Sequence, residues 1–182
     1  MRIALAMTLA LSIRNTLDES GLVRHTEIAG SIRRKRPDVG DIEIVAVPFD
    51  RGNLFGQSTD PYVSIQPGML ELLGTMADDK LRKKGPRQYQ FDANGAQIDL
   101  FMALPENFGF ILALRTGPSS FSKKIVTQRS KGGLLPSYMR SRDGRLWVVT
   151  NHLRVMRSYS IPDEQTLFTI LEIPYIPPEE RK

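Results

Sequence analysis

The sequence predicts an α+β protein, in which helices and strands occupy different stretches of the chain. Three observations support this prediction. An apolar pattern with helical spacing covers residues 2–18, two alternating segments flank Asn94-Gly95, and the pattern beyond Pro105 becomes mostly helical again. At 182 residues the chain is long enough to bury a sizeable core, as one domain or as two small lobes.

Composition narrows the possible partners and chemistries. The chain has 41% apolar and 25% charged residues, as globular proteins do. Its 25 Lys and Arg against 20 Asp and Glu give a net charge of +5 and a pI of about 9.6, which favours an anionic partner such as nucleic acid. With no Cys and only His25 and His152, the chain is excluded from disulfide, thiolate and multi-histidine metal chemistry.

The first helix is expected over residues 2–18, ending near Gly21, which can close a helix. Arg2 before a short apolar run superficially resembles a secretory signal. The run is too short to span a membrane, and Thr8 and Ser12 interrupt it. We therefore expect a cytoplasmic protein that does not bind membranes.

Two strands are expected around the first sharp turn of the chain. The first covers residues 26–29, after which Gly30-Ser31 turns the chain and residues 32–36 form one helical turn. Over residues 41–47 acidic and apolar side chains alternate before the pattern becomes wholly apolar, as in a strand that enters a core from an edge. Asp41 and Glu43 are two residues apart and are expected to share a face of this strand.

The middle of the chain combines a loop, a helix and a basic run. Residues 49–61 are rich in Asp, Gly and Pro and are expected to form a surface loop. Residues 67–76 suit a short helix. Residues 80–87 carry five basic side chains in eight positions, which fits either contact with an anionic ligand or a solvated basic edge.

A β-hairpin is expected over residues 88–103, because Asn94-Gly95 between alternating segments strongly indicates a tight turn of the mirror-image type. The second arm carries Asp99, a lone acid among apolar residues. A buried carboxylate is unfavourable unless it is paired, so we expect a cationic partner beside it. Asp99 is the third carboxylate of the predicted site.

The remainder of the chain is expected to alternate helices with one hairpin. The expected elements are a helix over residues 108–114, a helix from Pro118 or Ser119 to Gly132-Gly133, a hairpin over residues 138–149 around Arg142-Asp143-Gly144, and a helix capped by Asp163 that continues to Leu171. Pro174, Pro177 and Pro178 are expected to close the chain in extended form.

The three acids suit nucleotidyl transfer, in which a hydroxyl attacks a nucleoside triphosphate. This reaction needs the triphosphate neutralised, the nucleophile activated and the leaving pyrophosphate stabilised, tasks that two divalent ions can share. Magnesium prefers hard carboxylate oxygens. We expect Asp41 and Glu43 to reach both ions, and Asp99 to bind the ion beside the nucleophile and to act as general base.

A phosphate site is expected just upstream of these acids. The turn at Gly30-Ser31 can aim backbone amides and a hydroxyl at phosphate oxygens, and Arg34 can add a bidentate contact. Each feature also has an ordinary explanation: Ser31 as a helix cap, the acids of residues 41–43 as solvent-facing side chains, and residues 33–36 as a charged turn. Their joint occurrence with Asp99 favours the site, and the sequence contains no rival phosphate-loop, dinucleotide or serine-nucleophile motif.

Five stretches of the sequence form a set: Gly30-Ser31-x-Arg33-Arg34, Gly40-Asp41-Ile42-Glu43-Ile44, Ile98-Asp99-Leu100, Thr116-Gly117 and the ending from Leu171 to Arg181. Together they resemble family X DNA polymerases, the polymerase beta relatives within the nucleotidyltransferase superfamily. The resemblance covers the chain from about Glu27 to its end. The first stretch is shared across the superfamily, whereas the Thr-Gly turn and the proline-rich ending are more particular to family X.

The resemblance implies a nucleotidyltransferase palm in residues 1–104, with a mixed sheet and helices on one face, and a small α/β thumb in residues 105–182. Larger members carry further DNA-gripping modules, so this chain resembles the minimal palm-and-thumb form. The resemblance also implies two Mg²⁺ ions, for which Mn²⁺ can substitute, bound by Asp41, Glu43 and Asp99. The implied nucleotide contacts are Gly30, Ser31, Arg34, Gly40, Thr116, Gly117, Ser119 and Ser122.

The implied activity is a DNA polymerase that adds deoxynucleotides to a primer 3′-hydroxyl, filling short gaps in DNA repair. Its partners would be primer-template or gapped DNA and nucleoside triphosphates, and we expect a monomer. We assign DNA binding to basic residues expected on one thumb helix, so that affinity falls steeply with salt. These residues are Lys123, Lys124, Arg129 and Lys131.

The sequence departs from the family pattern at three places, one of which is that the polar residues expected to contact the base after Thr-Gly are only Ser119 and Ser122. Glu43 stands where the polymerases usually have Asp, and Leu114-Arg115 stands where the family commonly has an aromatic pair, which leaves ribonucleotide use open. Two other classes of function also stay open. One is a non-templated nucleotidyltransferase that acts on RNA, a protein or a small molecule, and the other is a non-catalytic nucleic-acid-binding protein with the same fold.

Overall fold

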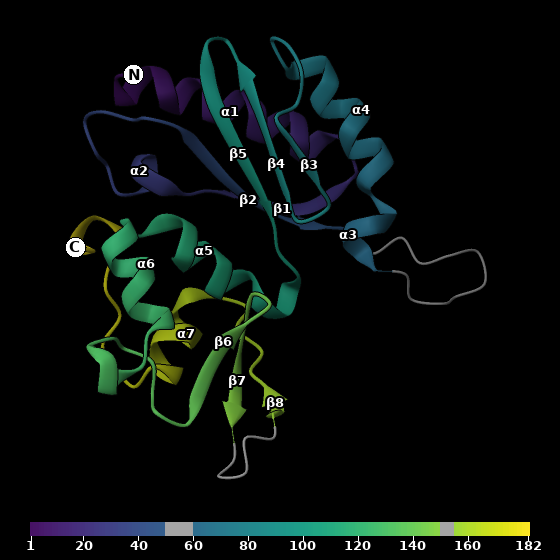
Figure 1. Cartoon of the computed structure of the whole chain (residues 1–182). Helices are drawn as coiled ribbons and strands as arrows, with labels where there is room; N and C mark the ends of the chain where they lie inside the picture. The colour runs from purple at the N-terminus through teal and green to yellow at the C-terminus, as the bar shows by residue number, and fades with distance from the viewer. Residues whose placement is uncertain (50–59, 150–154) are drawn as a thin grey trace. The chain divides into compact units, whose positions relative to one another are not determined.

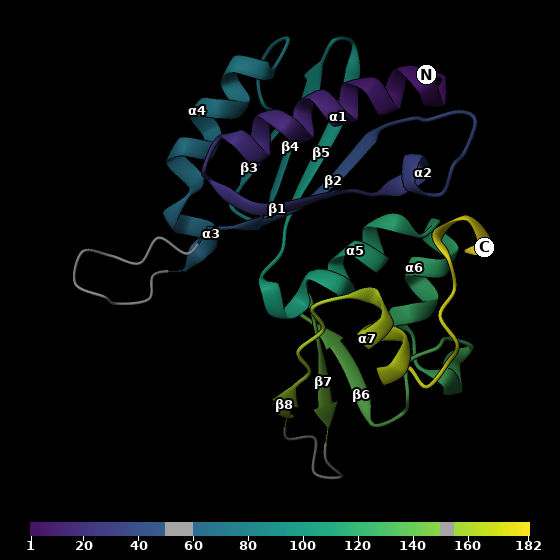
Figure 2. The same cartoon turned by 180° about the vertical axis from the view of Figure 1, so that it is seen from behind.

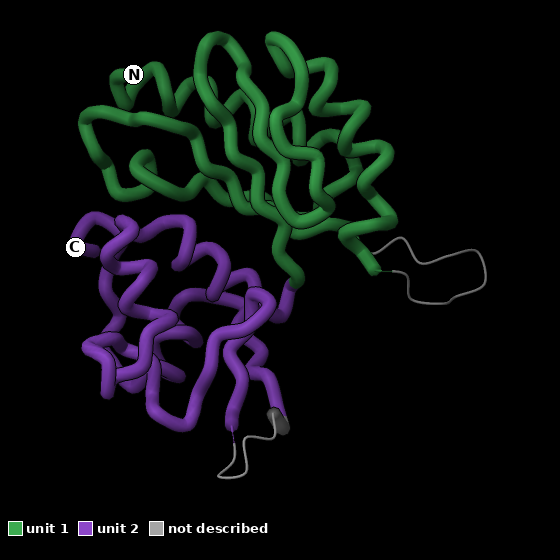
Figure 3. Tube along the Cα trace, viewed as in Figure 1, with its two compact units in different colours: residues 1–104 green, residues 105–182 purple. Residues whose placement is uncertain are grey.

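The computed structural model describes residues 1–49, 60–149 and 155–182 of the chain. These residues form two compact units, Met1–Leu104 and Pro105–Lys182 (Figure 3). Each unit has its own hydrophobic core. No helix among the described residues is both long enough and apolar enough to cross a membrane.

The first unit is built on a mixed five-stranded sheet (Figure 1). The strands in spatial order are β1 (Val23–Ile28), β2 (Ile42–Pro48), β5 (Ala96–Met102), β4 (Gln88–Ala93) and β3 (Lys83–Gly85). Only the central pair, β2 and β5, is parallel, and every other neighbouring pair is antiparallel. The short β3 lies within the basic run, where no strand was predicted.

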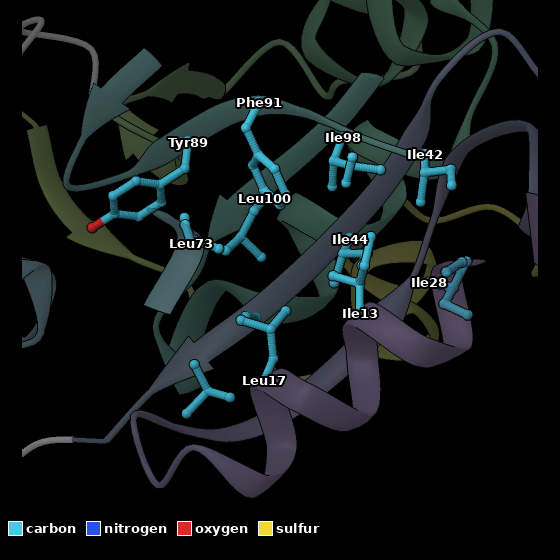
Figure 4. Close-up of a cluster of buried hydrophobic side chains, with 14 of the residues drawn as sticks. Ile13, Leu17, Ile28, Ile42, Ile44, Leu73, Tyr89, Phe91, Ile98 and Leu100 are labelled. Carbon is cyan, nitrogen blue, oxygen red and sulfur yellow. The ribbon is translucent and has the colours of Figure 1, made fainter. Parts of the chain in front are cut away.

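Two helices cover one face of this sheet, α1 (Ile3–Glu19) and α4 (Gln66–Met76) (Figure 2). The side chains that α1 buries recur every three or four residues and include Ile13 and Leu17. In Figure 4 these two side chains lie in one cluster with Ile44 and Leu100 of the central strands. A short helix, α3 (Pro61–Ser64), precedes α4, and most of the predicted loop before it, residues 50–59, lies outside the described residues.

Because side chains alternate along a strand, Glu43 and Asp99 lie on the face of the sheet opposite the helix-covered core. On β5, Ile98 and Leu100 enter the helix-covered core, so Asp99 between them points away from it. Glu43 likewise lies between Ile42 and Ile44 of the same core. The two acids therefore share the face that α1 and α4 do not cover.

The predicted hairpin over residues 88–103 is confirmed as β4 and β5. Asn94 and Gly95 form its two-residue turn with φ values of 49° and 70°. Positive φ at both positions is the requirement of the mirror-image turn, which Asn and Gly tolerate best. This turn fixes the register of the pair, so that Ala93 faces Ala96 and Gln90 faces Asp99.

The second unit combines a three-stranded antiparallel sheet with helices. Its elements are η1 (Pro105–Asn107), α5 (Phe108–Thr116), α6 (Ser119–Val126), η2 (Arg129–Lys131), β6 (Met139–Arg142), β7 (Arg145–Val149), β8 (Val155–Ser158), α7 (Glu164–Ile170) and η3 (Pro178–Glu180). The predicted cap of α7 is confirmed, because the Asp163 carboxylate accepts a hydrogen bond from the Thr166 amide at 2.7 Å. The predicted hairpin around Asp143-Gly144 is confirmed as β6 and β7.

A buried ion pair holds the end of the chain in the second unit. Arg181 is 1% exposed and donates to the Glu164 carboxylate at 2.7 Å and to the Ile176 carbonyl at 3.1 Å. Its guanidinium also lies over the rings of Phe121 and Phe168. Removing one member of such a pair leaves a buried charge, so the carboxy-terminal segment is an integral part of this unit's core.

Three predicted boundaries were wrong. The second helix of the later half ends at Val126 rather than at Gly132-Gly133, because the Leu134 amide donates back to the Lys124 carbonyl and folds the chain over the helix end. The helical turn after the first strand, α2 (Gly30–Arg33), begins at Gly30 rather than at residue 32. The proline-rich ending is not wholly extended, since it contains η3.

Candidate active site

The parallel pairing of β2 with β5 brings two of the predicted acids together. Glu43 and Asp99 are register partners on these adjacent strands, and alternation places both on the same face. Asp41 precedes β2 by one residue and lies two positions before Glu43. Three carboxylates separated by up to 58 residues in sequence thus come from one small region of the sheet.

Asp99 is 5% exposed, and glutamine amides rather than a cation satisfy its carboxylate. Gln88 donates to Oδ1 at 3.1 Å, Gln90 donates to Oδ1 at 3.0 Å and to Oδ2 at 3.1 Å, and Gln97 donates to Oδ2 at 2.8 Å. These donors are neutral, and a metal cation as the partner of Asp99 stays a prediction. Neutral donors stabilise a buried carboxylate without cancelling its charge.

The Asp41 carboxylate is electrostatically coupled to Asp99. Burial raises the pKa of Asp41 above its usual value of 3.8, and the negative charge of Asp99 raises it further. The Asp41 amide and the Arg34 guanidinium oppose this shift in pKa. Asp41 and Asp99 are therefore close enough to repel each other, and Arg34 is close enough to Asp41 to attract it.

The Glu43 side chain is directed at Gly30. Its Oε2 atom lies 2.1 Å from the position that a Cβ atom on Gly30 would take, and Gly30 has a φ of +61°. Among the described residues, no three carboxylate, imidazole or thiol side chains converge closely enough to hold one metal ion. Asp41 thus interacts electrostatically with Asp99, whereas the Glu43 carboxylate lies against Gly30. The three carboxylates do not surround a single point.

The donor set nevertheless fits a magnesium site. All three candidate ligands are hard carboxylate oxygens, which Mg²⁺ and Mn²⁺ prefer. A cation beside Asp41 and Asp99 would relieve the repulsion that raises the pKa of Asp41. The Glu43 carboxylate would have to leave Gly30 to join them.

The predicted phosphate site contains a buried hydroxyl with no hydrogen-bond partner among the described residues. This atom is Oγ of Ser31, in the first turn of α2. Buried polar atoms are almost always satisfied, so this hydroxyl can still form a hydrogen bond with a ligand or a water molecule. Arg34 ends the same short helix, and Gly40 has open space where a side chain would lie. Ser31 and Arg34 thus lie before the segment that connects α2 to β2, and Gly40 lies at its end, directly before Asp41.

The predicted nucleotide contacts of the later half lie on the second unit. Thr116 ends α5 and is fully buried, and Gly117 follows it against Phe121. Ser119 is exposed at the start of α6. The Ser122 hydroxyl donates to the Leu114 carbonyl at 2.6 Å, so in this structure it fastens α6 to α5.

The four predicted DNA-binding residues do not share one helix, contrary to expectation. Lys123 and Lys124 are exposed on α6, whereas Arg129 and Lys131 lie on η2 beyond its end. Arg129 is engaged within the unit, because it forms an ion pair with Glu172 at 2.8 Å and donates to the Leu171 carbonyl. Arg129 is exposed as well, but its guanidinium is already paired, whereas Lys123, Lys124 and Lys131 are exposed lysines.

Sequence reasoning missed the glutamines around Asp99, although the signal was present. Gln88 and Gln90 alternate with Tyr89 and Phe91, which marks one polar and one apolar face. A two-residue turn at Asn94-Gly95 then places Gln90 opposite Asp99.

Comparison with solved structures identifies a fold of the polymerase beta type. The polymerase beta of Leishmania infantum, solved as a ternary P/T complex, matches with a TM-score of 0.78. The match covers 100% of this chain and 76% of that chain, with 17% sequence identity. None of the protein-family models or curated proteins that were compared matches the sequence. The comparison confirms the predicted α+β nucleotidyltransferase fold, with its mixed sheet and helices.

Substitution of Gly30 tests the packing between the turn and Glu43. We expect Gly30→Ala to lower the free energy of unfolding by about 2–3 kcal/mol, of which about 1–2 kcal/mol is left-handed backbone strain and the rest is displacement of the Glu43 carboxylate. Gly95→Ala is the matched control, because Gly95 has a φ of +70° and open space at Cβ. Urea unfolding measures both variants, and equal losses would show that Glu43 does not press on Gly30.

Substitution of Asp41 tests its electrostatic coupling. A raised pKa means that stability linked to Asp41 is full below its usual value of 3.8 and is lost as the pH rises through the raised value. Without divalent ions, Asp41→Asn should therefore be more stable than the parent at pH 7 and equal to it near pH 3. Urea unfolding at both pH values, with exposed Asp79→Asn as control, checks this. A variant less stable than the parent at pH 7 contradicts the coupling.

Proposed function

We propose that this chain is a nucleotidyltransferase, and specifically a family X DNA polymerase that adds deoxynucleotides to a primer 3′-hydroxyl. The observation that carries the proposal is that Glu43 and Asp99 are register partners on parallel strands. Asp41 lies two residues before Glu43. Acids from two adjacent strands on one face supply the oxygen ligands that such a reaction needs. The polymerase beta-type fold supports the same class.

Magnesium would be held by the carboxylates of Asp41, Glu43 and Asp99. When bound, two such ions would neutralise the phosphates and lower the pKa of the attacking hydroxyl. Asp99 would accept the proton of the hydroxyl, and the glutamine amides would hold its carboxylate in place. The primer oxygen would then bond to the α-phosphorus while the bond to pyrophosphate breaks.

The turn before Asp41 would bind the triphosphate. The Ser31 hydroxyl is buried and has no partner among the residues described, so a phosphate oxygen would complete its hydrogen bonding. The first amides of α2 lack acceptors within the helix and can donate to the same group. Arg34 would contribute a charge-assisted contact, and Gly40 would leave room for the ligand.

The proposed second substrate is primer-template or gapped DNA. The exposed Lys123 and Lys124 of α6 would contact its phosphates. The L. infantum polymerase was solved as a ternary P/T complex, which supports this choice. We propose that the chain acts as a monomer in gap-filling repair.

Primer extension tests the proposal. We expect Asp99→Asn to lower Mg²⁺-dependent incorporation by about 10²- to 10⁴-fold, the range for loss of a general base. Exposed Asp79→Asn should keep the parent rate. Retained extension by a folded Asp99→Asn variant would contradict the proposed chemistry.

The same assay identifies the reaction. Templated and untemplated ends are compared, each with deoxynucleotides and with ribonucleotides. A DNA polymerase extends the templated primer with complementary deoxynucleotides. Equal extension of untemplated ends, or of RNA, would indicate a non-templated nucleotidyltransferase instead.

A further inference from the structure

Three glutamines on two strands surround the Asp99 carboxylate, and we call them the glutamine cluster: Gln88 and Gln90 on β4 and Gln97 on β5. All three share the face of the sheet that carries Asp99. Gln97 lies two residues before Asp99 on β5, Gln90 is the register partner of Asp99, and Gln88 lies two residues before Gln90 on β4. Gln97 precedes Ile98, the register partner of Ile42, and so lies at the level of Asp41. The cluster therefore borders the proposed metal ligands.

The cluster occupies both oxygens of Asp99. Oδ1 accepts from Gln88 and Gln90, and Oδ2 accepts from Gln90 and Gln97, with donor–acceptor distances of 2.8–3.1 Å. Because a carboxylate can only accept, the amide nitrogens must face it. Four contacts from two strands leave the plane of the carboxylate little freedom to rotate.

Gln90 is the central member of the cluster. It faces Asp99 directly in the β4–β5 register, and among the three glutamines it alone donates to both carboxylate oxygens. Gln88 and Gln97 each reach a single oxygen. Loss of Gln90 would therefore remove one contact from each oxygen, leaving Gln88 on Oδ1 and Gln97 on Oδ2.

We propose that Gln90 is a positioning residue for the reaction, which orients Asp99 toward the metal and the primer hydroxyl while leaving its negative charge intact. This role rests on the proposed function. An amide donor is neutral, so it satisfies a buried carboxylate without cancelling its charge. A metal ion that binds Asp99 would take the place of one of the four glutamine contacts, while the others keep the carboxylate oriented. A Lys or Arg at this position would offer hydrogen bonds but would also neutralise the ligand.

The first test removes the donor and measures metal binding directly. Mn²⁺ affinity is determined by electron paramagnetic resonance without DNA or nucleotide, for the parent and for Gln90→Met. We expect affinity to fall about 10- to 100-fold, the usual range for loss of a residue that orients a metal ligand. Gln66→Met is the matched control, because Gln66 donates a 2.8 Å bond to the Lys84 carbonyl in the same unit. It should bind Mn²⁺ as the parent does.

The second test separates positioning from a purely structural role. At saturating metal, kcat of Gln90→Met should fall about 10-fold or more, while KM for the nucleotide stays unchanged. A purely structural role would lower the melting temperature and leave the Mn²⁺ affinity and kcat of the folded fraction unaltered. Gln90→Lys keeps donors but adds a positive charge, so it should also lose Mn²⁺ affinity, and parent-like binding would overturn the requirement for a neutral donor.

Asp99→Asn distinguishes failure of this inference from failure of the proposed function. If Asp99→Asn loses Mn²⁺ binding and extension while Gln90→Met matches the parent, Gln90 does not position Asp99. If Asp99→Asn binds Mn²⁺ as the parent does, the metal site itself is refuted. Should Gln90→Met fail to fold, Gln97→Met removes one donor to Oδ2. It is then expected to weaken Mn²⁺ several-fold, and unchanged binding would overturn the role of the cluster.

Discussion

The parallel pairing of β2 with β5 is the constraint on which the candidate site depends. It joins strands whose acids lie more than fifty residues apart in sequence and puts Glu43 beside Asp99. The core fixes this arrangement, because Ile42, Ile44, Ile98 and Leu100 must face α1 and α4. A shift of one residue in either strand would turn its acid into that core and its apolar side chains out of it. The same packing that stabilises the first unit therefore orients the carboxylates.

Bringing acids together carries an electrostatic penalty, which the surrounding residues reduce in different ways. Arg34 attracts Asp41, whereas the glutamine cluster satisfies Asp99 with neutral hydrogen bonds. Burial raises the pKa of Asp41 above its usual value, and the negative charge of Asp99 raises it further. Glu43, the longer of the candidate ligands, lies against Gly30. A divalent cation would complete this arrangement in the proposed function.

Local signals made much of the fold predictable. Asn94-Gly95 defined a hairpin, Asp163 capped a helix, and the resemblance to polymerases gave the α+β fold that the structural comparison confirms. Features set by distant contacts were not predicted. The end of α6 depends on a bond from Leu134, and the burial of Arg181 depends on Glu164 seventeen residues earlier. The site residues and their metal stay predictions, although Asp99 and its neighbours now have defined positions.

The central claim is that Asp41, Glu43 and Asp99 bind catalytic metal ions next to a triphosphate held by Ser31. Anomalous diffraction from crystals grown with Mn²⁺ and a non-hydrolysable deoxynucleoside triphosphate tests it most directly. The account predicts Mn²⁺ at roughly 2.1 Å, close to the Mg²⁺–oxygen distance, from oxygens of all three carboxylates, with Glu43 moved away from Gly30 and a phosphate oxygen bonded to Ser31. An anomalous map without Mn²⁺ at these acids, while nucleotide is bound, would contradict it.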